Sequence, residues 1–172
     1  MQLIPSMWRQ ELIHPLLVHL PIAIVPVASL FLICFLLLSK KYEVNFLRPA
    51  FSWLLFLSCL GVAMAMKSGD LAEHVVNKVI CDPTVTKKHE ELAEIVTILV
   101  LLSGALEITR LILIKLKNKF ISSYEFKINL AICLLMFLAS LTLTQVGHLG
   151  ASLTYQQAAA VYVPSKECKE FE

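Results

Sequence analysis

Four long stretches of almost uncharged residues constrain this chain more than any other feature of its sequence. They cover residues 15–38, 46–66, 92–114 and 128–147, and are 24, 21, 23 and 20 residues long. A helix of roughly 20 apolar residues crosses the hydrocarbon core of a bilayer, which is about 30 Å thick. The sequence therefore predicts an all-α polytopic membrane protein, an antiparallel bundle of four transmembrane helices in a single domain over residues 1–172.

The overall composition supports the same class. Hydrophobic residues make up 58% of the chain and charged residues 16%, against about 45–50% and about 25% in soluble domains. The formal net charge of +2 does not give the basic surface that nucleic-acid-binding proteins need. Soluble enzymes, disordered chains and nucleic-acid-binding proteins are therefore excluded, and the lipid bilayer is the first expected partner.

The distribution of lysine and arginine predicts how the bundle sits in the membrane, because cytoplasmic loops retain these residues. The two short turns near residues 39–45 and 115–127, with their flanks, carry eight basic and three acidic residues. The other side, with both termini and the loop 67–91, carries seven basic and ten acidic residues. We therefore expect cytoplasmic turns. The termini, the loop and the C-terminal extension 148–172 should face outward, into a periplasm if the membrane is a bacterial inner membrane.

Two cysteines, Cys81 and Cys168, fall on the predicted outward side. An oxidising compartment would allow them to form a disulfide that ties the C-terminal extension to the loop. Two thiols alone do not require a bridge, so unpaired cysteines remain an equal alternative.

All five histidines also fall on the predicted outward side, at or near the ends of the four spans. They are His14, His19, His74, His89 and His148. Neutral imidazole binds haem iron, copper and iron, and helical bundles commonly hold cofactors between facing helices. The pattern predicts a redox centre held by histidines, either a b-type haem or, less favoured, a copper or iron ion.

The depth of each histidine ranks the candidate ligands. His19 and His148 lie at or just inside the hydrocarbon boundary, where ionisable side chains usually face a bundle interior or a cavity. We therefore expect these two to be ligands first, His89 next, and His74 or His14 after that. The same leading three, His19, His148 and His89, would bind a bare metal ion.

Two glycines near the end of the fourth span, Gly147 and Gly150, would let a planar macrocycle approach closely. Simpler roles for the other histidines stay open. His14 could anchor the start of the first helix, His74 could be solvated, and His89 could belong to a wet, charged surface.

Three local patterns predict structure rather than chemistry. Gly69 and Asp70 resemble a helix end and turn after the second span. Glu107 and Arg110, three residues apart in the third span, predict a structural ion pair. The last helix is expected to continue beyond the membrane to about Ala160, because residues 148–161 are rich in helix formers.

The first span opens with IHPLLVHLPIAI at residues 13–24, and the fourth ends with GHLGASLT at residues 147–154. These segments closely resemble the HPxxVHFPIA and GHxGGSLTHG motifs of a bacterial membrane family, domain of unknown function 2231 (DUF2231). Family members also show Gly-Asp after the second span and a histidine before the third, here Gly69-Asp70 and His89. The resemblance covers essentially the whole chain. It departs at Ala151, where the family has glycine, and at Tyr155-Gln156, where the family has His-Gly.

Some members of this family are fused to c-type cytochrome modules, which implies a redox or respiratory role. We therefore expect electron transfer between a membrane partner or quinone and a periplasmic acceptor, such as a cytochrome c or a respiratory complex. A non-enzymatic accessory or assembly subunit of a larger membrane complex is the alternative. A metal-dependent hydrolase that uses Asp70, His74, His89 and Glu90 is the third. The sequence assigns no catalytic residue.

Overall fold

The computed structural model describes residues 9–116 and 119–161. The described residues form four α-helices and no strand: α1 (Gln10–Leu38), α2 (Leu47–Val76), α3 (Pro83–Lys115) and α4 (Lys119–Gln157). Each helix is long and apolar enough to cross a membrane. The prediction of a four-helix membrane bundle is confirmed.

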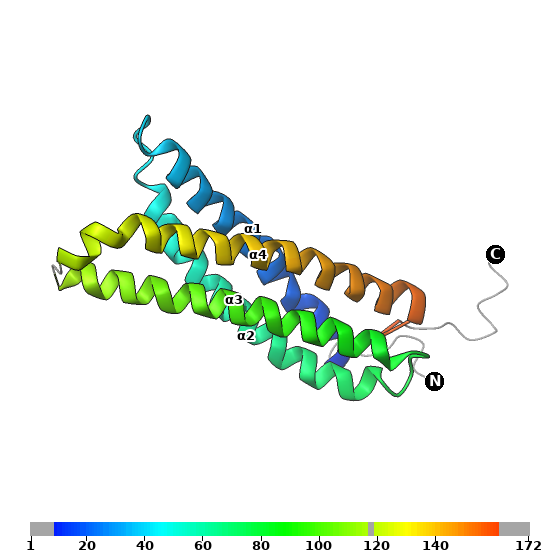
Figure 1. The fold of residues 1–172 in the computed structure, drawn as a ribbon. Helices are drawn as coiled ribbons and strands as arrows, with labels where there is room; N and C mark the ends of the chain where they lie inside the picture. Colours follow the sequence, from blue (N-terminus) through cyan, green and yellow to red (C-terminus); the bar gives the residue numbers. More distant parts are fainter. Residues whose placement is uncertain (1–8, 117–118, 162–172) are drawn as a thin grey trace.

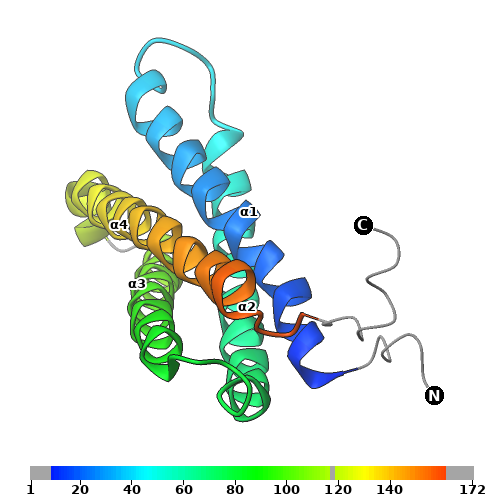
Figure 2. The ribbon, with the colours of Figure 1, turned by 90° about the vertical axis from the view of Figure 1, so that its right-hand side faces the viewer.

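The four helices form two antiparallel hairpins, in which α1 packs against α2 and α3 against α4 (Figure 1). Contacts between α2 and α3, and between α4 and α1, join the hairpins, so that α1 lies diagonally opposite α3. The hairpins cross at an angle and diverge where their turns lie (Figure 2). We call this the turn end. At the opposite, terminal end, which the charge distribution predicts to be outward, α1 begins and α4 finishes.

Large apolar side chains both fill the bundle and cover its outside. Leu32, Phe51 and Met136 in the interior have no exposed surface, whereas Leu16 and Trp53 on the outside are each 72% exposed. Extended apolar surfaces are rare on soluble monomers. On a transmembrane helix they face lipid tails, so this surface is consistent with a bundle embedded in a bilayer.

The predicted outward loop of residues 67–91 is mostly helical, and residues 77–82 alone connect α2 to α3. Helix α3 starts at Pro83, nine residues before its apolar stretch, because its first turn is capped. The Asp82 carboxylate accepts hydrogen bonds from the N–H (2.9 Å) and the hydroxyl (2.7 Å) of Thr84, and Pro83 takes the first helical position. These hydrogen bonds also lower the pKa of Asp82. Hydropathy locates the part of a helix that lies in lipid, whereas caps determine where the helix ends.

The helix end predicted at the Gly-Asp pair is wrong, because α2 continues from Gly69 to Val76. A Cβ atom on Gly69 would lie 3.3 Å from Cε1 of His14. Glycine at this position therefore leaves space for the His14 ring and does not end the helix. The end of α4 at Gln157 falls close to its expected position, and the next residue, Ala158, turns the chain with a φ of 55°.

Candidate functional site

His14 of α1 points into the bundle and lies against α2. Its Nδ1 atom is 3.1 Å from the carbonyl oxygen of Ala65 and 3.1 Å from Oγ of Ser68. Ser68 is buried and donates its own hydroxyl hydrogen to the Ala65 carbonyl at 2.9 Å. The ring fits because Gly69 has no side chain at the point of contact.

His89 of α3 has the same kind of environment, provided here by α4. Its Nδ1 atom is 3.0 Å from the carbonyl oxygen of Val146. A Cβ atom on Gly150 would lie 3.3 Å from Cε1 of the His89 ring, whereas one on Gly147 would meet nothing within 4 Å. Of the two predicted glycines, only Gly150 makes room for a histidine.

The two half-buried rings meet each other inside the terminal end of the bundle. Their centres are 6.1 Å apart and their planes are nearly perpendicular, at 88°. His14 comes from α1 and His89 from α3, which lie diagonally opposite. All four helices therefore build this site: two provide the rings, and the other two provide the carbonyls and glycines that hold them.

The hydrogen bonds select one tautomer for both histidines. A carbonyl oxygen can only accept, so each Nδ1 must carry a hydrogen and donate it. In a neutral ring the other nitrogen, Nε2, then has a free lone pair. No hydrogen bond to either Nε2 is made by the residues that the structure describes. Metal-binding histidines are oriented in this way, with the non-binding nitrogen donating to a carbonyl or carboxylate.

The other three histidines lie on the surface of the helices. His19 on α1, His74 on α2 and His148 on α4 are all exposed. Nδ1 of His19 lies 2.6 Å from the carbonyl oxygen of Pro15, one turn earlier in the same helix. None of the three contacts another histidine in the described chain. The structure thus brings together His14 and His89, but not His19 and His148.

Two further site predictions concern metal ions and a disulfide. Among residues 9–116 and 119–161, no group of three or more His, Cys, Asp or Glu side chains is arranged to hold a metal ion. Cys81 is an exposed free thiol. Cys168 lies outside the described residues, so the Cys81–Cys168 disulfide stays a prediction.

A second polar cluster is buried near the turn end, around Glu107 of α3, whose side chain has no exposed surface. Its carboxylate accepts from Nη1 of Arg48 at 3.1 Å, from Nε of Arg110 at 3.0 Å and from the Ser52 hydroxyl at 2.7 Å. The predicted ion pair between Glu107 and Arg110 is confirmed, with a closest distance of 2.9 Å. Arg48 extends it to α2.

Helix α4 completes this buried charge cluster. Asn129 accepts from Nη2 of Arg48 at 2.9 Å, and the half-exposed Glu125 accepts from Nη1 of Arg110 at 3.0 Å. Two arginines are therefore balanced by two glutamates. Ionisable groups within a membrane are expensive unless they are paired, so this neutral arrangement ties α2, α3 and α4 together.

The sequence carries signals for both clusters. Gly69 and Gly150 mark the places where the two rings approach a neighbouring helix, whereas depth in the membrane places His14 among the last candidate ligands. Arg48 is one of the eight basic residues of the two turns and their flanks, although it lies inside the second of the four apolar stretches. An arginine in such a stretch is costly unless it is paired, and Glu107 in the third stretch is its partner.

Comparison with known proteins places the chain in a family. A family model described as "Predicted membrane protein (DUF2231)" matches residues 11–162. No curated protein and no solved structure matches the chain. The match includes all four helices except the first residue of α1, and therefore includes His14 and His89. The chain therefore belongs to the DUF2231 family of predicted membrane proteins.

Proposed function

We propose that this chain binds one b-type haem between His14 and His89 and transfers electrons at the outward face of a bacterial inner membrane. One observation carries the proposal. The ring centres of two imidazoles from diagonally opposite helices lie 6.1 Å apart, and each ring is held through Nδ1 by a backbone carbonyl, which leaves a lone pair on its Nε2.

The distance between the rings fits a shared iron. Metal–imidazole nitrogen bonds are about 2.0–2.1 Å long, so two nitrogens on opposite sides of one metal lie roughly 4 Å apart. Adding the distance from each nitrogen to its ring centre gives roughly 6 Å between centres. The centres of His14 and His89 are 6.1 Å apart.

The number of ligands favours haem over a bare ion. Bare zinc in proteins takes three or four protein ligands, whereas haem iron needs only one or two axial ligands because the macrocycle supplies the rest. The histidine pair offers two. Gly69 and Gly150 would let the rings keep their positions against the helix backbones.

When bound, a haem supplies one-electron chemistry. His14 and His89 would both hold the iron, and a haem held by two histidines would supply electron transfer rather than oxygen chemistry. The proposed partners are a membrane quinone on one side and a periplasmic acceptor, such as a cytochrome c or a respiratory complex, on the other.

The experiment that tests the proposal compares haem content among histidine variants. The wild-type protein and the H14A, H89A, H19A and H148A variants would be purified in detergent, and haem per chain measured by the pyridine haemochrome method. We expect H14A and H89A to lose the haem, and H19A and H148A to retain it. Helix content by circular dichroism would show that all variants fold. Retention in H14A and H89A, with loss in H19A or H148A, would overturn the assignment.

A second candidate function is an accessory subunit of a larger membrane complex. The exposed position of His19 on α1, inside the first candidate span, favours it, because ionisable side chains in membranes rarely face lipid. A neighbouring subunit would cover this histidine. This candidate predicts that other membrane proteins copurify with the wild-type chain, and that H19A releases them without loss of haem.

A further inference from the structure

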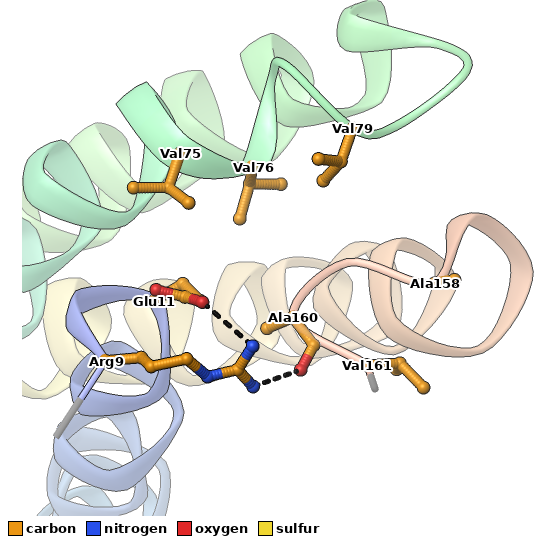
Figure 3. A pocket seen from close by; sticks show the side chains of 8 residues that line it. All are labelled: Arg9, Glu11, Val75, Val76, Val79, Ala158, Ala160 and Val161. Atoms are coloured by element: carbon orange, nitrogen blue, oxygen red, sulfur yellow. Dashed lines mark hydrogen bonds and ion pairs between the residues drawn. The ribbon is translucent and has the colours of Figure 1, made fainter. Parts of the chain in front are cut away.

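A cavity of about 290 Å³ lies at the terminal end of the bundle, between segments that are far apart in the sequence. Figure 3 shows Arg9 and Glu11, at the start of α1, facing the valines Val75, Val76 and Val79 at and beyond the end of α2. The segment that follows α4 lines the remaining side. The cavity therefore has one charged wall and one apolar wall.

The charged wall has unused hydrogen-bonding capacity. Nη1 of Arg9 is 3.3 Å from Oε1 of Glu11, and Nη2 is 3.4 Å from the carbonyl oxygen of Ala160. Both distances exceed the usual range of about 2.7–3.2 Å. Nε of Arg9 is buried and has no partner in the described structure. A buried N–H without an acceptor costs free energy, so a ligand oxygen near Arg9 would remove this penalty.

The two walls define the chemical class of the ligand. Arg9 and Glu11 carry opposite charges, so their wall is neutral overall and favours a neutral headgroup over an anion. Arginine only donates hydrogen bonds and an ionised glutamate only accepts them, so the headgroup should carry both an acceptor and a donor. The valines favour an apolar group between the polar ends of the ligand. A quinol, with two hydroxyl oxygens on an apolar ring, meets all three conditions.

The position of the cavity connects it to the histidine pair. Glu11 precedes His14 by three residues, which is about 4.5 Å along the axis of α1. A headgroup beside Glu11 would therefore lie beside the turn of α1 that precedes His14.

We propose that this cavity binds the headgroup of a membrane quinol that donates electrons to the centre held by His14 and His89, an inference that rests on the proposed function. Oxidation of one quinol to the quinone releases two electrons and two protons. A haem held by His14 and His89 would accept these electrons one at a time, and a one-electron acceptor protein at the outward face would take them up. The two protons pass to outward water, the Glu11 carboxylate taking each one first.

The test measures two properties of the purified, haem-containing protein: binding of decylubiquinone and the rate of haem reduction by decylubiquinol. Arg9→Gln removes the donor charge, and Val75→Phe fills the cavity. Lys78→Gln, which removes an exposed charge near the end of α2 that does not line the cavity, is the matched control. We expect R9Q to weaken binding and slow reduction about tenfold or more, because it loses a charge-assisted hydrogen bond. V75F should weaken both because the larger side chain occupies the space of the headgroup, and K78Q should match the wild type.

The outcomes separate this inference from the proposed function. Unchanged haem content and unchanged reduction by dithionite in R9Q and V75F would show that the variants fold and keep the centre. Haem that decylubiquinol does not reduce, or reduces equally fast in all variants, would overturn the quinol site and leave the haem assignment standing. A chain without haem that still binds decylubiquinone, with binding lost in V75F, would overturn the haem and retain the cavity assignment. Binding of phosphatidylglycerol in place of the quinone would overturn the quinol.

Discussion

Among single residues, His14, His19 and His89 differ in which backbone carbonyl their Nδ1 atoms bond. His14 and His89 donate to carbonyls of a neighbouring helix, so their rings are fixed across helix interfaces. Nδ1 of His19 bonds within its own helix and leaves the ring on the outside. The first kind of hydrogen bond makes the position of a ring depend on how neighbouring helices pack, and it is found for the two rings whose centres lie 6.1 Å apart.

The glycines beside these rings give the first prediction, because Gly150 and Gly147 lie in the same helix in different surroundings. A side chain on Gly150 would meet the His89 ring, whereas one on Gly147 would point into open space. We expect Gly150→Leu to displace His89 from the Val146 carbonyl and to lower haem content severalfold, as measured by pyridine haemochrome.

Gly147→Leu is the matched control, because it introduces the same side chain into the same helix. It should leave haem content unchanged. Equal haem content in both variants would show that the contact between Gly150 and His89 does not support the site.

The helices are held together by different means at the two ends of the bundle. At the terminal end, rings and backbone carbonyls join neighbouring helices. Near the turn end, Glu107 joins Arg48 of α2 to Arg110 of α3, and α4 contributes Asn129 and Glu125. The buried charge cluster thus fixes three helices relative to one another where the hairpins diverge.

Removal of the central charge should therefore be costly. Glu107→Gln would leave two buried arginines with only the half-exposed Glu125 to balance them. Breaking a buried pair on one side typically costs about 3–5 kcal/mol, so we expect the free energy of unfolding in mixed micelles to fall by about 3 kcal/mol or more.

The control for this substitution is Glu125→Gln, at the half-exposed end of the same cluster. Exposed pairs contribute about 0–1 kcal/mol, so the change in unfolding free energy should be below about 1 kcal/mol. Similar losses of unfolding free energy in the two variants would mean that burial does not determine how much each glutamate stabilises the bundle.

The lengths of the helices show what a sequence reveals about elements. Uncharged stretches located all four helices, because lipid requires a minimum apolar length. They did not locate the end of α2 or the start of α3, which is set by local hydrogen bonds such as the Asp82 cap. The turn predicted near residues 115–127 is also wrong in extent, because α4 already begins at Lys119. The turn predicted at Gly69 is wrong because the sequence does not distinguish a glycine that leaves space for a neighbouring ring from one that ends a helix.

The whole molecule has a predicted orientation that its only exposed described cysteine can test. Cys81 lies in the connection at the terminal end, and its thiol is free. In a Cys168→Ser background, a membrane-impermeant maleimide should label Cys81 in cells whose outer membrane is permeabilised and whose inner membrane is intact. Lys41→Cys at the turn end, in a chain without Cys81 and Cys168, should be labelled only after the inner membrane is permeabilised. The reverse pattern would invert the orientation.

For the whole molecule, the sequence predicted the architecture more completely than the site. Span length, charge asymmetry and the two terminal motifs suffice for a four-helix membrane bundle of the DUF2231 family. Which histidines meet depends on the rotation of each helix about its axis, and nearly continuous apolar stretches carry little information about rotation. His14 and His19 are five residues apart in one helix, so they point in different directions, and packing against Gly69 turns the first one inward.

Whether His14 and His89 hold a haem is tested by the reduced-minus-oxidised visible spectrum of the detergent-purified wild-type protein, produced in cells supplied with haem. We expect an α band of the b type and about one haem per chain, because one pair of histidines would hold one haem. A flat difference spectrum from folded protein, with no haem by pyridine haemochrome, would contradict it.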